Sequence, residues 1–167
     1  MKSNKINILI ISVIIISILF YWYDEEYGMD RADTFEVNSY DLQDKLLIAT
    51  QQSDYKDALV RSIIKKVDSP QLYIKVTDVS NLKNIDADSF NAIVILHTWE
   101  LWKAPESVVS FIQNNFQNNI YVVGTSSAGD LSIADIDGFS SASVIDHVDD
   151  DTETFLDWYN KKLPLMN

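Results

Sequence analysis

Residues 46–67 read LLIATQQSDYKDALVRSIIKKV, and this stretch decides the fold class. Its first four residues form a continuous apolar run, which is typical of a strand buried on both faces of a sheet. Three polar residues then make a turn, after which Ser53 or Asp54 can cap a helix. This helix has one apolar stripe at helical spacing, formed by Tyr55, Leu59, Ile63 and Val67, with Ala58 and Ile64 beside them. The stretch therefore predicts one strand–helix unit of a parallel sheet.

The same alternation continues toward the C-terminus. We predict four further strands, over residues 72–79, 92–96, 120–123 and 139–144. One helix should begin at Pro105 and another in the acidic run at residues 149–151, where carboxylates complement the helix dipole. The strand at 72–79 alternates polar and apolar residues, so we place it at an edge of the sheet. Only about a dozen residues join the last two strands, which is close to the minimum for a parallel crossover, and we expect a helical turn there.

An apolar segment precedes this pattern. Lys2 and Lys5 lead into residues 6–20, which carry no charge, and the Tyr-Trp-Tyr cluster of residues 21–23 suits a membrane–water interface. The stretch of about 18 residues is near the lower limit for a helix that crosses the hydrocarbon core. A cleaved signal peptide is the alternative, but no small residues follow the apolar run to form a cleavage site. We therefore expect an uncleaved transmembrane helix that anchors the chain, over residues 1–23.

The charges on either side of this segment predict its orientation. Lysines precede it and acidic residues follow it, so the positive-inside rule places the N-terminus in the cytoplasm and the rest of the chain outside an inner or plasma membrane. Residues 24–44 are polar, acidic and aperiodic, and we interpret them as a stalk. Residues 45–167 then form the α/β domain.

The composition excludes several classes of function. The net charge is −12, which makes nucleic acid a poor partner because phosphate contacts need clustered Lys and Arg. The chain has no cysteine, which excludes disulfides, thiolate catalysis and Cys-ligated metal sites. With only His97 and His147 available, we expect no histidine metal site.

Polar and aromatic residues follow three of the predicted strands. In an open parallel sheet, ligands bind beyond the carboxyl ends of the strands, where the loops at 50–54, 97–104 and 124–130 should meet. The candidate site residues are the hydroxyl-bearing and tryptophan side chains of these loops: Thr50, Ser53, Thr98, Trp99, Trp102, Thr125 and Ser126. The alternative is that short polar loops need such residues without any ligand.

The segment VILHTWELWKAP at residues 94–105 resembles the third strand and following loop of flavodoxins. Together with the order of strands and helices and the loop at 124–130, this resemblance covers roughly residues 45–163. It implies a five-stranded doubly wound parallel sheet with strand order 2-1-3-4-5. It also implies that Thr98 and Trp99 contact the ring of an FMN cofactor and that Thr50 begins the phosphate loop.

Two departures from the flavodoxin pattern weaken the cofactor site. Gln52, Ser53 and Tyr55 stand where the family has Thr, Gly and Thr, and the lost glycine is the residue that lets backbone N–H groups approach a phosphate. Residues 125–138 contain no aromatic side chain to stack on the ring. We therefore expect a non-enzymatic module with a degraded FMN site and no cofactor, which binds a small ligand or a protein partner. The alternative is an FMN-binding electron carrier.

A different reaction class has a weaker pattern. Gly124-Thr125-Ser126-Ser127-Ala128 is one residue short of the nucleophile elbow of a serine hydrolase, and Asp146 and His147 follow in the order of that fold. The elbow must turn directly into a helix, however, and residues 131–138 do not have a helical pattern. A serine hydrolase is therefore the weakest of the alternatives.

Overall fold

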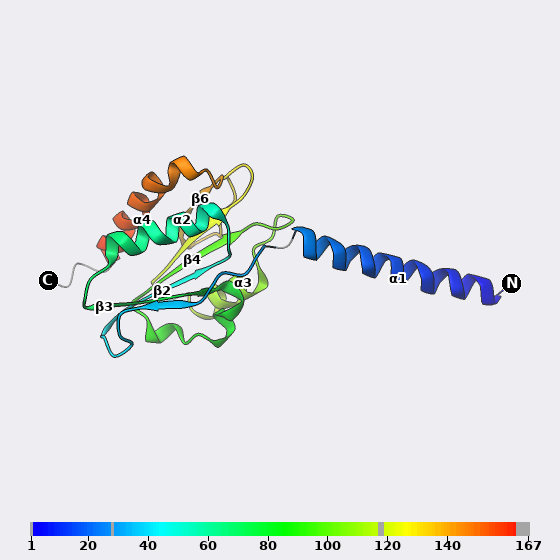
Figure 1. Ribbon diagram of the computed structural model, residues 1–167, viewed down its shortest axis with the longest axis horizontal. Coiled ribbons are helices and arrows are strands. Elements are labelled where there is room, and N and C mark those ends of the chain that lie inside the picture. Colours follow the sequence, from blue (N-terminus) through cyan, green and yellow to red (C-terminus); the bar gives the residue numbers. More distant parts are fainter. Residues whose placement is uncertain (1, 28, 117–118, 163–167) are drawn as a thin grey trace.

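A six-stranded sheet forms the centre of the computed structural model, which describes residues 2–27, 29–116 and 119–162 (Figure 1). The spatial order is β1-β3-β2-β4-β5-β6. The strands are β1 (Phe35–Val37), β2 (Asp44–Thr50), β3 (Leu72–Asp78), β4 (Ala92–Thr98), β5 (Ile120–Thr125) and β6 (Asp137–Ser141). β1 is antiparallel to β3, and the other neighbouring pairs are parallel. Numbered along the chain, the five parallel strands have the order 2-1-3-4-5 that the flavodoxin resemblance implies. The antiparallel β1 makes the sheet six-stranded and mixed, which corrects the predicted five-stranded parallel sheet.

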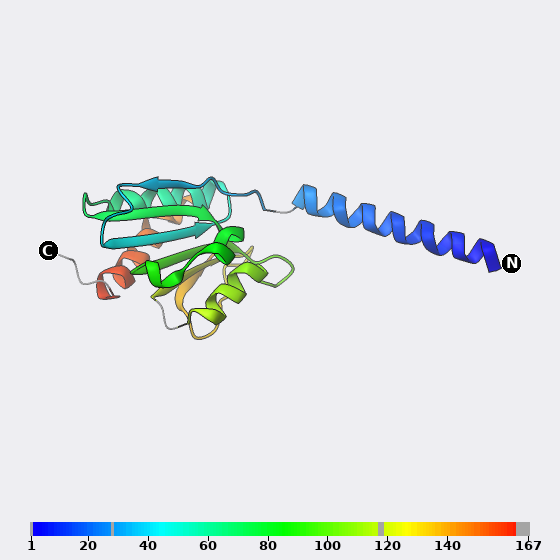
Figure 2. The ribbon, with the colours of Figure 1, turned by 90° about the horizontal axis from the view of Figure 1, so that it is seen from below.

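Helices cover both faces of this sheet, also as predicted. α2 (Asp54–Val67) and α4 (Val148–Lys162) lie together on one face, and α3 (Glu106–Asn114) lies on the other with the 3-10 helix η1 (Val79–Asn84) (Figures 1 and 2). Two more 3-10 helices are η2 (Ala87–Ser89) and η3 (Ile145–His147). Strand residues alternate between two apolar clusters, so that Leu46 and Ile48 face α2 whereas Leu47 and Ala49 face α3.

The antiparallel strand β1 lies within the region predicted to be a stalk. Phe35 pairs with Val76 and Val37 with Ile74, so β1 covers the free edge of β3. The prediction that β3 is an edge strand is therefore wrong. Asn38 then reverses the chain at φ 65, and its side chain donates hydrogen bonds to the carbonyl oxygens of Ser69 (2.9 Å) and Leu72 (2.7 Å).

The connection between β5 and β6 also differs from expectation. Residues 126–136 form a loop with no helix, so the predicted helical turn is wrong. Gly129 and Asp135 have positive φ (67 and 63), a conformation that turns the backbone without a helix. The Ser140 hydroxyl donates a hydrogen bond to the Leu131 carbonyl and so holds this loop to β6.

The N-terminal helix α1 (Lys2–Tyr27) projects away from the domain (Figures 1 and 2). Its large apolar side chains between Ile6 and Trp22 are 52–72% exposed. Within the part of the chain that the structure describes, no helix is both long enough and apolar enough to cross a membrane. This corrects the transmembrane helix predicted over residues 1–23. The physical reason is length, because the uncharged run of residues 6–23 rises by about 27 Å as a helix, less than the ~30 Å of a hydrocarbon core.

Candidate ligand-binding crevice

A crevice of about 630 Å³ opens at the carboxyl ends of the central strands. It is lined by the start of α2, by the ends of β4 and β5, and by the segment after β6: Ser53, Asp54, Tyr55, Lys56, Thr98, Trp99, Thr125, Ser126, Ser127, Ala142, Ser143 and Ile145. Met29, just beyond α1, completes the lining. The three loops predicted to meet at this edge of the sheet therefore do meet.

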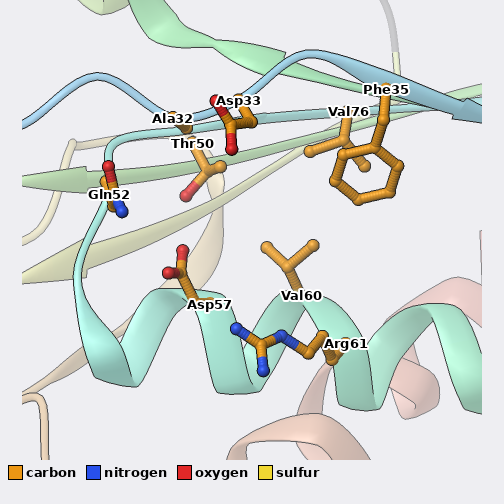
Figure 3. Close-up of a pocket in the computed structure, with 9 residues that line it drawn as sticks. All are labelled: Ala32, Asp33, Phe35, Thr50, Gln52, Asp57, Val60, Arg61 and Val76. Atoms are coloured by element: carbon orange, nitrogen blue, oxygen red, sulfur yellow. The ribbon is translucent and has the colours of Figure 1, made fainter.

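Five of the predicted site residues line this crevice: Ser53, Thr98, Trp99, Thr125 and Ser126. Thr50 does not, because its buried hydroxyl donates to the Gln51 carbonyl (2.9 Å) and its side chain faces a separate cavity of about 160 Å³ between the sheet and α2. In that cavity Asp57 and Val60 point from α2 toward the strands (Figure 3). Trp102 does not line the crevice either, because it lies at the tip of a turn, 81% exposed.

The crevice holds a buried lysine that is not among the predicted site residues. Lys56 is in the first turn of α2 and only 1% exposed. Its ammonium donates hydrogen bonds to Oγ1 of Thr98 (2.7 Å) and to Oγ of Ser53 (3.4 Å). Burial lowers the pKa of Lys56 to about 8, against a smaller opposite effect of the carboxylates of Asp57 and Glu100. Both hydrogen-bond acceptors are neutral hydroxyls, so neither of them balances the charge of the ammonium.

Neighbouring elements fix the position of this ammonium. Ser53 caps α2 by accepting the backbone N–H of Lys56 at 3.2 Å, as predicted for the helix start. The Thr98 hydroxyl also lies 3.0 Å from Oγ1 of Thr125, which donates to the carbonyl of His97 at 3.2 Å. The backbone N–H of Thr98 in turn donates to the Gln51 side chain at 2.7 Å. The hydroxyl chain that binds Lys56 is therefore anchored on β4 and β5.

Trp99 forms one wall of the crevice and packs against β5. A Cβ atom placed on Gly124 would lie 2.7 Å from Nε1 of Trp99, so the indole approaches the strand to a distance that only glycine permits. Nε1 of Trp99 is buried and has no hydrogen-bond partner among the described residues. The indole is thus held against the protein rather than presented as a free stacking face.

A hydrogen-bonded pair from α2 and α4 closes the opposite side. Tyr55 donates a 2.5 Å hydrogen bond to Oδ2 of Asp151, and the Ser141 hydroxyl donates to the same oxygen at 3.2 Å. Burial and the Asp151 carboxylate raise the pKa of Tyr55, so the phenol stays protonated. This contact joins the start of α2 to the start of α4 at the rim of the crevice.

His97 lies on the other face of the sheet, in a smaller cavity of about 290 Å³ beneath the β5–β6 loop. Its side chain is fully buried, and Nε2 has no hydrogen-bond partner among the described residues. Burial lowers the pKa of His97 to about 4, so the imidazole is neutral at pH 7. No group of three or more His, Asp or Glu side chains in the described ranges could hold a metal ion.

The crevice residues do not fit FMN. The loop at 50–55 contains no glycine to bring backbone N–H groups to a phosphate, and Lys56 bonds the Thr98 hydroxyl that the flavodoxin resemblance assigns to the ring. No aromatic residue lies in the β5–β6 loop opposite Trp99. The nucleophile elbow of a serine hydrolase needs a helix directly after the serine. In the described structure Ser126 is followed by a loop, so residues 124–128 do not form this elbow.

Comparison with known proteins identifies no family. No protein-family model matches the chain, and no curated protein matches it. Among solved structures, it is similar to Smu.1420 from Streptococcus mutans UA159, with 9% identity, a TM-score of 0.41, and coverage of 72% of this chain and 100% of that one. It is also similar to a two component transcriptional regulator AraC from Clostridium phytofermentans ISDg, with 16% identity, a TM-score of 0.39, and coverage of 71% and 98%. These similarities concern the α/β fold alone.

Proposed function

We propose that this chain is a membrane-attached, flavodoxin-like module that binds a small anionic ligand in the strand-end crevice, without FMN and without catalysis. The observation that carries the proposal is the buried ammonium of Lys56. A cation out of contact with water is costly unless an anion balances it. Within the described residues, no carboxylate lies within ion-pair distance of Lys56.

The surroundings of Lys56 favour an anion as the balancing group. The ammonium lies at the N-terminus of α2, where the helix dipole adds positive potential. Ser53 and Ser126 supply hydroxyl donors around the same space. A carboxylate or phosphate that entered the crevice would accept from these groups and would raise the pKa of Lys56, so binding should weaken above about pH 8.

The membrane part of the proposal rests on α1. A helix that is apolar on all sides needs an apolar environment around it, and the apolar side chains of α1 do not pack on the domain. We place these side chains in lipid, so that α1 attaches the chain to a membrane without crossing it. Carbonate extraction of membranes tests the attachment.

Titration of the full chain in zwitterionic detergent tests whether the crevice binds an anion. Inorganic phosphate and FMN serve as the two probes, followed by tryptophan fluorescence and by the melting temperature. We expect phosphate to raise the melting temperature, the Lys56→Met variant to lose that shift, and the exposed Lys65→Met variant on the same helix to keep it. If phosphate and FMN have no effect on wild type, the anion-binding proposal fails.

The electron carrier is the second candidate, favoured by the strand order and by the position of Thr98 and Trp99 at the crevice. Saturable quenching of tryptophan fluorescence at low micromolar FMN, unchanged in Lys56→Met, would favour this candidate over the anion-binding module.

A further inference from the structure

A tight turn beside the crevice has an unusual sequence for its geometry. Glu100 and Lys103 exchange two backbone hydrogen bonds of 2.9 Å each, so Leu101 and Trp102 form a two-residue hairpin turn. Both residues have positive φ, 48 and 61. Turns of this kind favour Asn and Gly at these positions, because a Cβ atom is strained there.

The side chains at these two strained backbone positions point away from the protein. Leu101 is 70% exposed and Trp102 is 81% exposed, so packing within the domain does not compensate for the strain. Strained backbone persists in proteins where it has a function. The turn thus holds an aliphatic and an indole side chain outside the domain at a conformational cost, which indicates a partner with an apolar surface.

Contacts place this turn close to the end of α1. The Gln51 side chain donates to Oε1 of Glu100 (3.1 Å), and Gln51 also pairs with Arg31. The N–H of Gln52 donates to the carbonyl of Asp30 (3.0 Å). Asp30 follows the last residue of α1, Tyr27, after only two intervening residues, a span of about 10 Å. The turn therefore lies at the end of the domain that any membrane holding α1 would approach.

From this geometry we infer that the Leu101–Trp102 turn is a second membrane contact, which inserts into the interface of an electrically neutral bilayer. Tryptophan favours this interface, where its ring lies among headgroups and its N–H stays hydrated. Ile145, 51% exposed on the crevice rim, adds apolar surface at the same end. The net charge of −12 disfavours anionic lipid. This inference rests on the proposed attachment through α1, and it places the crevice opening toward the membrane surface.

The chain has no cysteine, so single-cysteine spin labelling tests the inference directly. The full chain is placed in phosphatidylcholine nanodiscs with a nitroxide at Leu101→Cys, at Ile14→Cys in α1, or at Gln71→Cys, an exposed site before β3 and thus at the opposite end of the sheet. Collision of each label with oxygen and with a nickel chelate then reports lipid or water. We expect the oxygen-to-nickel ratio at Leu101 to exceed that at Gln71 several-fold, and Trp102→Glu to abolish the difference.

The three labels separate the two proposals. A lipid-exposed label at Ile14 together with a water-exposed label at Leu101 would overturn the turn insertion and leave the α1 attachment standing. Water exposure at both sites would overturn both. A label at Leu101 that is shielded from both reagents would show a protein contact instead of lipid, and that outcome also overturns the inference.

Discussion

His97 and Thr98 are consecutive residues of β4, yet their side chains lie in different cavities on opposite faces of the sheet. Thr98 accepts a hydrogen bond from the buried Lys56 ammonium, whereas His97 is a buried neutral imidazole. Burial lowers the pKa of both bases, Lys56 to about 8 and His97 to about 4. The two groups therefore couple stability to pH in different ranges, one alkaline and one acidic.

Lys56→Met should stabilise the unliganded chain at neutral pH. Below pH 8 the lysine is protonated in the folded and unfolded states, and the folded state bears the full cost of burying the charge. We expect the variant to gain about 1–3 kcal/mol in unfolding free energy. Between pH 8 and 10.5 the unfolded chain binds more protons, so wild type gains stability as pH rises and the advantage of the variant shrinks by about 2 kcal/mol by pH 10.

Urea unfolding of the full chain in zwitterionic detergent at pH 7.5 and pH 10 measures this difference. Lys65→Met is the control, because Lys65 is an exposed lysine on the same helix. An advantage of Lys56→Met that is equal at both pH values would contradict a buried ammonium.

His97→Leu should remove part of the acid sensitivity of the fold. Because the folded pKa of about 4 is below the ordinary value of 6.5, the unfolded state binds more protons between these values, and wild type loses stability as pH falls through this range. We expect wild type to lose about 2 kcal/mol more than the variant between pH 7 and pH 5. Urea unfolding at both pH values, with the exposed His147→Leu as control, checks this result; parallel losses in all three chains would show that His97 does not titrate as its burial implies.

The local patterns of the sequence predicted much of this fold. The β2–α2 unit was predictable because its apolar run, its cap at Ser53 and its helical stripe all lie within about twenty residues. The strand β1 was not, because three residues carry no periodicity and their stability comes from pairing with β3, more than thirty residues away. The conformation of β1 is therefore set by its pairing with β3, which is distant in sequence, and not by its own residues.

The candidate site was predicted less completely. Topology brought Ser53, Thr98 and Thr125 together because parallel strands end at one edge. Lys56 was missed because a lysine in a helix is ordinarily a solvated residue. A signal was present, since a cation in the first turn of a helix opposes the helix dipole. Trp102 was assigned to the site because it lies in the loop after β4. Its outward position follows from positive φ angles at Leu101 and Trp102, which are not expected of these residue types.

Gly124→Ala should displace Trp99 from its position against β5. The new methyl would lie 2.7 Å from Nε1 of Trp99 and 3.2 Å from the carbonyl of Leu131, so the indole must shift away from β5. We expect a loss of about 1–3 kcal/mol in unfolding free energy and a change in tryptophan emission. In a Trp99→Leu background the same substitution should cost at least ~0.5 kcal/mol less, as measured by a double-mutant cycle. Equal costs in both backgrounds would show that Leu131, and not Trp99, sets the limit.

The turn variant Leu101→Asn/Trp102→Gly should stabilise the fold, because Asn and Gly adopt positive φ with little strain and the replaced side chains are mostly exposed. We expect a gain of about 1–2 kcal/mol in unfolding free energy, measured by urea unfolding of the full chain in detergent. Leu101→Ala/Trp102→Ala removes the same side chains but keeps a Cβ atom at both positions, so it should show no such gain. A gain of equal size in the alanine variant would place the cost of the native turn in its exposed apolar surface, and not in its backbone.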